Sequence, residues 1–501
     1  MQETMDLALE LNTEFANFYC FIPNTQVYSF QGNIPIEKID IGKEIFSGQS
    51  TTKIINKSQH HYRGNVFEIK PRFLPPVTAT PNHPILIAQL QRDRTNKAQI
   101  KNYFWKKPGE IICFNKSNPS FSYDAVIVPK NKPKEDKQTQ VDFSLFVQGQ
   151  VGGGRKGGQL NQVGKRYLKL WKVNADLAEL FGWYTAEGYR LSKINNQIGF
   201  ALSSEEKENI TRVKELIYKC FNFKSRVIQR KGKCVVISLT SKVLYRALPI
   251  LFGNNSHEKK VPSFIMEAST KIIKAFLKGY IAGDGTTKPN KLGQYNVVTC
   301  SKDLSLQIMI LFLKIGIVPS YLEIDPKISK YRGQVIKGGK AYSLSWIDSV
   351  KHKYYLEDNN NYYIPVKTIK KKLYQGMVYN LMTESETYTV PFIVHNCTMA
   401  YPGSPLYNKI AMEESSRLPL TWEGYSQHGY ETYPLSNNNL LAKEILAFRD
   451  QAFHTYFSNE KYLNMIDNKF GQKVVKHIRD ITKIKLERRL LLEEKGGDNN
   501  V

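Results

Sequence analysis

The pattern of hydrophobic and polar positions at the start of the chain predicts β structure. Apolar and polar residues alternate over 20–47, between turn signals that contain Pro, Asn and Gly. The alternation continues through 61–70 and 76–88. A period of two places every second side chain on one face of a strand, so we expect an all-β domain here.

A different pattern follows, and it occurs twice. Residues 180–188 (LFGWYTAEG) and 277–285 (LKGYIAGDG) are two copies of one apolar motif, 97 residues apart, in which an acidic residue precedes the last glycine. Strand-like and helix-like stretches follow each copy and predict the order α-β-β-α-β-β-α in each half, hence a duplicated α+β domain. The strand-like stretches are 197–204, 233–241, 295–301 and 341–349, and the helix-like ones are 205–221 and 302–317.

Small residues stand four positions apart in both copies, as Gly182 and Ala186 do in the first. Residues four apart lie one above the other on a helix, so two such faces can pack with their backbones close together. That packing would bring the helix ends together and place Glu187 beside Asp284. The alternative is a pair of ordinary core helices with glycine caps and no active site.

Composition predicts folded domains in a reducing compartment. The 501 residues suffice for about two to four domains, and a hydrophobic content of 41% argues against wholesale disorder. No apolar run is long enough to span a membrane, so we expect no membrane partner. The start of the chain is acidic and unlike a signal peptide, which favours a cytoplasmic location.

The six cysteines show no paired spacing, which argues against a zinc site or a disulfide framework. We expect Cys113, Cys220, Cys234 and Cys300 to be core residues.

Charge is concentrated in the middle of the chain. Residues 20–396 contain 57 basic and 28 acidic residues, whereas 1–19 contain four acids and no base. Neutralising phosphates releases counterions, so this excess predicts a nucleic-acid partner. The alternative is surface charge that only keeps the protein soluble.

Cys20 and the tripeptide His395-Asn396-Cys397 have the chemistry needed at the two ends of a self-excising segment. The Cys20 thiol can attack the preceding carbonyl, and the Cys397 thiol can accept the acyl group. The Asn396 side chain can close a succinimide and cleave the chain after itself. Each residue alone would be ordinary, so the prediction depends on their order and on the β patterns around them.

Thr80 and His83 belong to the same set. Amide attack by Cys20 is uphill unless the leaving nitrogen gains a proton, and His83 can supply one. Thr80 can orient the imidazole of His83 or bond the strained amide. Residues 20–47, the Thr-x-x-His block and the closing junction resemble an intein, a protein-splicing element with a Hint domain. The resemblance implies excision of 20–396 without a cofactor and ligation of the flanks.

The closing blocks of this family include a strand pair, which residues 376–390 resemble, and a junction histidine that would be His395. The family often has Asp where this chain has Asn380, and His where it has Thr387. Both helpers act at the C-terminal step, so an element with impaired splicing is an alternative.

The two acidic residues of the repeated motif suggest metal chemistry. Adjacent carboxylates repel each other, and a divalent cation with oxygen ligands, such as Mg²⁺, relieves the repulsion. The pair resembles the two motifs of a LAGLIDADG (DOD-type) homing endonuclease, which implies metal-dependent hydrolysis of DNA with Glu187 and Asp284 as ligands. Two motifs in one chain imply a monomer.

More of the nuclease pattern surrounds these motifs. Lys259 precedes the second motif in a Lys-x-hydrophobic-Pro arrangement that the family shares, which implies a role in stabilising phosphate charge. A solvated lysine beside Lys260 is the alternative. The resemblance also implies two sheets that bind the major groove of a double-stranded DNA target. A basic protein that binds DNA without cleaving it stays open as an alternative.

The flanks show a separate resemblance. Residues 16–19 joined to 397–407 would read ANFYCTMAYPGSPLY, which is similar to the C-terminal part of cobalamin-binding radical SAM proteins. The chain contains no Cys-x-x-x-Cys-x-x-Cys motif, so we expect no iron–sulfur cluster. The basic, amphipathic residues 474–494 predict a helix.

Together these patterns predict a multi-domain fold: a discontinuous all-β Hint domain, an inserted duplicated α+β endonuclease, and mostly α-helical flanks. The expected parts are the flank 1–19, the Hint segment 20–130, a basic linker or DNA arm 131–172, the endonuclease 173–355, the Hint segment 356–396, and the flank 397–501.

Overall fold

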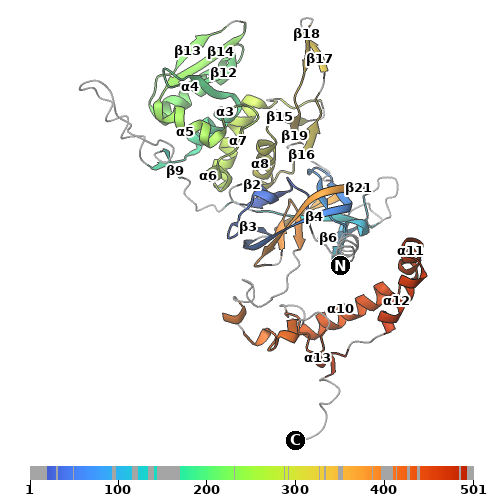
Figure 1. Cartoon of the computed structure of the whole chain (residues 1–501). Helices are drawn as coiled ribbons and strands as arrows, with labels where there is room; N and C mark the ends of the chain where they lie inside the picture. Colours follow the sequence, from blue (N-terminus) through green and yellow to red (C-terminus); the bar gives the residue numbers. More distant parts are fainter. Residues whose placement is uncertain are drawn as a thin grey trace. The chain divides into compact units, whose positions relative to one another are not determined.

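The computed structural model forms two compact units, residues 1–396 and 397–501, and each is described here by itself (Figure 1). The structure describes residues 20–29, 32–48, 50–92, 98–114, 122–131, 133, 140–143, 170–230, 232–286, 288–291, 293–326, 328–331, 334–347, 354–385, 387–395, 410–412, 415–425, 429–436, 441–483 and 487–492.

The first unit contains a 10-stranded antiparallel sheet built from two distant segments of the chain. Its main path runs β22-β23-β6-β8-β21-β4-β3, with β5, β7 and β20 beside it. The strands are β3 Glu44–Ser47, β4 Ser50–Pro71, β5 Val77–Ala79, β6 Ile85–Arg92, β7 Ala98–Lys106, β8 Tyr123–Pro129, β20 Leu356–Glu357, β21 Asn361–Thr383, β22 Thr387–Thr389 and β23 Ile393–His395. A separate hairpin joins β1 Gln26–Ser29 to β2 Gly32–Pro35. The expected sheet-rich start of the chain is confirmed.

Two long strands join the segments before and after the repeated motifs. β4 has 22 residues and β21 has 23, and they pair from Pro71 with Val366 to Ile54 with Thr383. They form one long ribbon (Figure 1). Phe21 bridges to Tyr379 on β21, so the residue after Cys20 lies against this ribbon.

The first half of the duplicated region has the predicted order α-β-β-α-β-β-α. Its sheet has the order β11-β12-β14-β13. The elements are α3 Ala175–Glu187, β11 Gly188–Ser192, β12 Gln197–Ser203, α4 Lys207–Phe221, β13 Arg226–Gln229, β14 Cys234–Thr240 and α5 Lys242–Phe252.

The second half departs from that order. Its sheet has the order β15-β19-β16, and its elements are α6 Ser263–Met266, α7 Thr270–Asp284, β15 Gln294–Thr299, α8 Lys302–Lys314, β16 Ser320–Ile324 and β19 Ala341–Ile347, with a hairpin of β17 Ile328–Tyr331 and β18 Gln334–Lys337. The strand expected directly after α7 is reduced to an isolated bridge between Gly285 and Val297. Thr286 donates its N–H to Asn296 O at 2.9 Å, and Pro289, which lacks an N–H, follows closely.

Part of segment 131–172 is folded. β9 Gln140–Asp142 pairs with β10 Leu170–Lys172, and Phe143 is buried with its ring 6.5 Å from that of Phe181. The interior of this segment lies outside the described residues, so its role as a linker or a DNA arm stays a prediction.

The second unit is helical where it is described. It contains the 3₁₀ turns η4 Ser415–Arg417 and η5 Trp422–Tyr425 and the helices α10 Ala442–Phe457, α11 Glu460–Phe470, α12 Gln472–Lys483 and α13 Arg489–Leu492. The prediction of one helix over 474–494 is wrong, because Arg488 turns inward between α12 and α13 and binds Asp450 through two hydrogen bonds of 2.8 and 2.9 Å. None of the helices in the described ranges is long and apolar enough to cross a membrane.

The repeated helices α3 and α7 pack with their backbones in contact. A Cβ added to Gly182 would lie 2.1 Å from Phe276 O, and one added to Gly279 would lie 2.0 Å from Glu179 O. Real side chains do not approach a backbone oxygen so closely, so only glycine fits at both positions. This is the close approach that the spacing of small residues predicts.

Replacing Gly279 by alanine should push α3 and α7 apart, because the new methyl group would overlap Glu179 O. We expect the free energy of unfolding in urea to fall by about 3 kcal/mol. Gly109→Ala is the matched control, since its Cβ would meet only Phe67 at 3.6 Å. Equal losses in the two variants would contradict this account of the helix contact.

Candidate functional site

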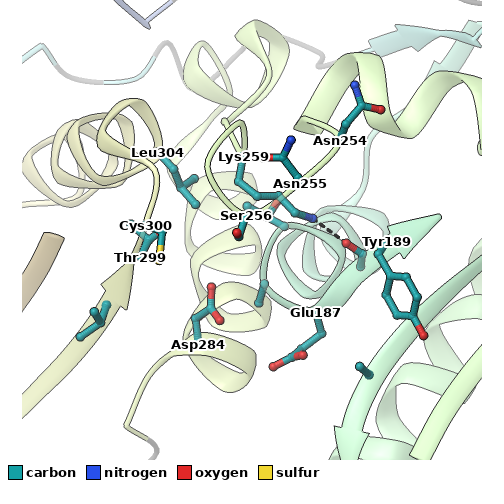
Figure 2. Close-up of a pocket in the computed structure, with 15 residues that line it drawn as sticks. Glu187, Tyr189, Asn254, Asn255, Ser256, Lys259, Asp284, Thr299, Cys300 and Leu304 are labelled. Atoms are coloured by element: carbon teal, nitrogen blue, oxygen red, sulfur yellow. Dashed lines mark hydrogen bonds between the residues drawn. The ribbon is translucent and has the colours of Figure 1, made fainter. Parts of the chain in front are cut away.

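A pocket of about 380 Å³ lies where α3 and α7 end (Figure 2). The last residue of each helix, Glu187 and Asp284, lines it. The other lining residues are Thr185, Ala186, Gly188, Tyr189, Ala201, Asn254, Asn255, Ser256, Lys259, Val298, Thr299, Cys300 and Leu304.

The two carboxyl groups at this pocket have pKa values that are raised toward neutral pH. Burial, and after it the charge of the neighbouring Asp284, raise the pKa of Glu187 to about 7. Burial also raises the pKa of Asp284 to about 6, although the charge of Lys259 opposes that shift. The close contact of the helices causes the proximity, because a Cβ on Gly283 would lie 3.2 Å from Glu187 Cγ.

This pair of carboxylates fits a hard divalent cation. Two partly buried acids with raised pKa values each gain from a nearby positive charge, and carboxylate oxygen is the ligand type that Mg²⁺ prefers. The described ranges contain no group of three or more His, Cys, Asp and Glu side chains arranged to hold a metal. Further ligands would therefore come from backbone oxygens, water or a bound substrate, as is usual for Mg²⁺.

Lys259 lies at the same pocket and is 7% exposed, so the alternative of a solvated lysine is wrong. Its Nζ donates to Tyr184 O and Gly188 O, both at 2.7 Å, and lies 4.6 Å from the centre of the Tyr184 ring. Burial lowers its pKa to about 8. The lysine therefore binds the carbonyl groups at the C-terminal end of α3, next to Glu187.

Sequence reasoning missed the turn 254–256 and the strand end at Thr299 and Cys300, which also line the pocket. The polar run Asn254-Asn255-Ser256 just before Lys259 was the available signal. Cys300 is exposed, so its prediction as a core residue is wrong. The turn after β15 places it at the pocket rather than in the core.

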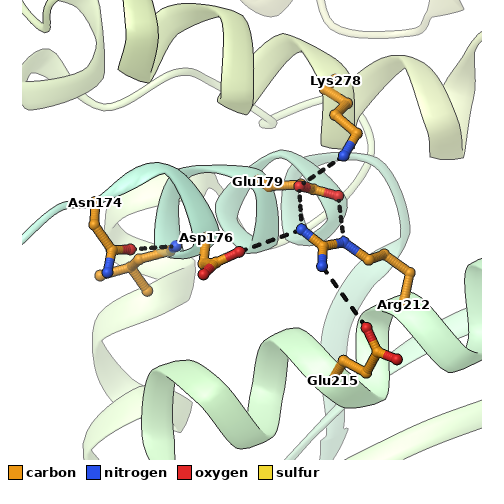
Figure 3. Close-up of polar contacts among 7 residues, drawn as sticks. Asn174, Asp176, Glu179, Arg212, Glu215 and Lys278 are labelled. Atoms are coloured by element: carbon orange, nitrogen blue, oxygen red, sulfur yellow. Dashed lines mark hydrogen bonds and ion pairs between the residues drawn. The ribbon is translucent and has the colours of Figure 1, made fainter.

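A cluster of charged side chains joins α3 to its neighbours (Figure 3). Glu179 accepts two hydrogen bonds from Arg212 of α4, at 2.9 and 2.7 Å, and one from Lys278 of α7 at 3.1 Å. Asp176 binds the same guanidinium at 3.2 Å. Burial alone would raise the pKa of Glu179, but the hydrogen bonds from Arg212 and Lys278 outweigh it and lower the pKa. The cluster fixes α3 against both α4 and α7.

A second constellation surrounds Cys20. Its backbone N–H donates to Thr80 Oγ1 at 2.9 Å, and Thr80 N–H donates to Cys20 O at 2.9 Å. His83 is fully buried in the same turn, where its N–H donates to Thr80 O at 3.2 Å and its ring lies 4.1 Å from that of Phe21. The structure therefore brings three predicted residues, Cys20, Thr80 and His83, to one place.

The thiol of Cys20 is poorly ionised in this environment. The residue is 3% exposed and packs with Tyr62, Val66 and Val378, and burial raises the pKa of the thiol to about 12. The amide of Asn380 accepts a hydrogen bond from the buried Tyr388 hydroxyl at 2.7 Å.

The closing residues of the predicted set are placed only in part. His395 ends β23, and its backbone pairs with Thr387. The side chain of His395 and all of Asn396 and Cys397 lie outside the described residues. The roles predicted for these three residues therefore stay predictions.

Comparison with known proteins identifies the region around the second motif. A family model for a LAGLIDADG-like domain matches residues 271–342. The chain is 24% identical over 410 residues to the ATP-dependent DNA helicase Hel308 of Thermococcus kodakarensis, a match that covers 75% of this chain and 36% of the helicase. It is 26% identical over 296 residues to a DNA polymerase of Thermococcus litoralis, covering 50% of this chain and 17% of the polymerase.

The chain thus spans about a third of the helicase and less than a fifth of the polymerase. A crystal structure of I-DmoI in complex with DNA and Ca aligns with a TM-score of 0.25 and 18% identity, over 34% of this chain and 82% of that one. The residues that match the LAGLIDADG-like family model, 271–342, run from α7 to the start of β19.

Proposed function

We propose that residues 20–396 are a protein-splicing insertion that contains a divalent-cation-dependent, site-specific DNA endonuclease. The observation that carries the nuclease proposal is the pair of partly buried, neighbouring carboxyls, Glu187 and Asp284, at the ends of two glycine-packed helices. The LAGLIDADG-like match over 271–342 supports the same assignment.

The relatives support the insertion proposal. A helicase and a polymerase catalyse different reactions, so a segment shared with parts of both fits an element inserted into unrelated proteins. Residues 20–396 make up 377 of the 501 residues. The flanks 1–19 and 397–501 would then belong to a host protein, and we propose the radical SAM resemblance for them.

In the nuclease, the residues of the pocket have separate tasks. Glu187 and Asp284 would hold Mg²⁺, which supplies activation of the attacking water and charge stabilisation during phosphodiester hydrolysis. Lys259 holds the end of α3 through Tyr184 O and Gly188 O, and thereby fixes the backbone on either side of Glu187. Its positive charge beside the pocket would also attract the phosphate group.

In the splicing reaction, Cys20 Sγ would attack the carbonyl carbon of Tyr19, which breaks the amide bond and forms a thioester. His83 would donate a proton to the leaving nitrogen. Thr80 Oγ1 holds that nitrogen in place, because it accepts a hydrogen bond of 2.9 Å from the Cys20 N–H. The Cys397 thiol would then take over the acyl group, Asn396 would cyclise and cleave the chain, and an S-to-N shift would join Tyr19 to Cys397.

One observation favours slow splicing as the second candidate. The Cys20 thiol has a pKa of about 12, because it is buried. Only a small fraction of the thiol is ionised at neutral pH, so the first step would be slow there and faster at higher pH.

Glu187→Gln and Asp284→Asn should each abolish double-strand cleavage while DNA binding remains, because each variant removes a proposed metal ligand. The assay uses Mg²⁺ and DNA in which the coding sequences for 1–19 and 397–501 are joined. Glu208→Gln, at an acidic residue on α4 away from the pocket lining, is the matched control and should cleave normally. Normal cleavage by the two pocket variants would refute the nuclease proposal.

Divalent-cation affinity should depend strongly on pH. The carboxyls with pKa values of about 7 and about 6 are protonated in acid, and protons compete with the metal for them. We expect the dissociation constant for Mn²⁺, measured by calorimetry, to rise about tenfold or more from about pH 8 to about pH 5. The Asp284→Asn variant should bind Mn²⁺ weakly at both pH values. If the affinity of the normal protein for Mn²⁺ did not depend on pH, the result would argue against Glu187 and Asp284 as ligands.

Splicing is tested by intact mass after expression under reducing conditions. The 57.6 kDa chain should yield two products, with about three-quarters and about one-quarter of its mass. Conversion should speed up as the pH rises, because the ionised fraction of a thiol with pKa of about 12 grows tenfold per pH unit. Cys20→Ala should block ligation, whereas equal product from this variant would exclude the proposed nucleophile.

A further inference from the structure

The long ribbon of β4 and β21 is strongly basic. The two strands carry eight Lys and Arg residues and one acidic residue, Glu68, which gives a net charge of +7 with histidines neutral. The basic residues are Lys53, Lys57, Arg63 and Lys70 on β4 and Lys367, Lys370, Lys371 and Lys372 on β21. Such a concentration within one element goes beyond what solubility requires.

Several of these cations are not neutralised within the protein. Lys372 binds Glu68, Lys70 Nζ donates to Leu74 O at 2.7 Å, and Lys57 Nζ donates to Glu37 O. The other cations, among them Arg63, Lys370 and Lys371, are exposed and have no carboxylate partner within the described part of the chain. Free cations in one exposed region indicate a polyanionic partner.

The strand register shows where these charges point. Lys371 pairs with Phe67 and Gln375 pairs with Arg63, so Lys371 and Arg63 stand on the same face, four residues apart along the ribbon. Four residues of strand span about 13 Å, close to the major-groove width of about 12 Å in B-DNA. Between them, the same face presents Leu373, which is 87% exposed, and Gln375 lies directly beside Arg63. Lys370 and Lys372 lie on the opposite face.

We propose that the β4–β21 ribbon is a second DNA-contact surface, which enters the major groove of a duplex. Arg63 and Lys371 would bind phosphates across the groove, and Leu373 and Gln375 would face the base edges. The inference rests on the proposed function only in taking DNA as the ligand, since none of these residues lines the pocket between α3 and α7.

The geometry favours duplex DNA over other polyanions. An anionic membrane presents a flat surface and would meet only one face of the ribbon, whereas the cations lie on both faces. The major groove of A-form RNA is too deep and narrow for side chains to read. A major groove of B-DNA admits a two-stranded β ribbon and offers phosphates on both sides of it.

The test compares two triple variants with the same loss of charge in the full-length chain. Arg63→Gln, Lys370→Gln and Lys371→Gln change the ribbon, while Lys207→Gln, Lys214→Gln and Lys219→Gln change exposed positions on α4. All six positions are exposed, so both variants should fold, which thermal unfolding would verify. Binding to a random-sequence duplex is measured at several salt concentrations.

The ribbon variant should bind DNA about tenfold or more weakly, and the slope of log K against log salt should become shallower by about 2 to 3. The α4 variant should stay within about twofold of the normal protein. Equal DNA binding by the two variants would overturn the inference. So would a ribbon variant that binds DNA normally but no longer binds anionic vesicles.

The outcome is separable from that of the nuclease proposal. If the normal protein never cleaves DNA but the ribbon variant alone loses duplex binding, the second surface stands and the nuclease proposal fails. If both triple variants bind and cleave normally, the nuclease proposal stands and the second surface fails.

Discussion

The contact between the backbones of α3 and α7 is the constraint on which the rest of this site depends. Gly182 and Gly279 leave no room for a side chain at the crossing, since an added Cβ would overlap a carbonyl oxygen of the other helix. Helices that approach so closely end close together, and each ends in an acidic residue. The helix packing thus creates a local repulsion between Glu187 and Asp284, and this makes the pocket a fitting site for a cation.

Neighbouring side chains hold this arrangement in place at both ends. Glu179 binds Arg212 and Lys278 near the start of α3, and Lys259 binds the last carbonyl groups of the same helix. A protein that brings two carboxyls together at a cost in stability needs such support, and sites of this kind are common where function rather than stability is selected.

The second site has a different construction. Cys20 and Thr80 come from the start of the chain, whereas Tyr379, which bonds to the residue after Cys20, lies on β21. The pairing of β4 with β21 brings these distant segments together. The duplicated region lies between them in the sequence, so both proposed activities depend on the same ribbon for their arrangement in one chain.

The contact between the two helices could be predicted from the sequence, because small residues four positions apart on a helix allow another helix backbone to approach closely. The alternation over 20–88 predicted the sheet for a similar reason. The burial of Lys259 and the exposure of Cys300 could not be predicted, because both depend on how the turn 254–256 and the end of β15 pack around the pocket. The loss of a strand after α7 and the break before α13 also depend on tertiary contacts, from Thr286 and Arg488.

The most direct test of the central claim is a double-mutant cycle on unfolding free energy at about pH 8 without divalent cations. A carboxyl whose pKa is higher in the folded than in the unfolded protein lowers stability as the pH rises above its unfolded pKa, and the loss is complete above its folded pKa. At about pH 8, Glu187→Gln and Asp284→Asn should therefore each stabilise the protein. Each also removes their shared repulsion, so the double variant should gain less than the sum of the two, by about 1 kcal/mol. Additive gains, within about 0.5 kcal/mol, would show that the two carboxyls do not interact and would contradict the account.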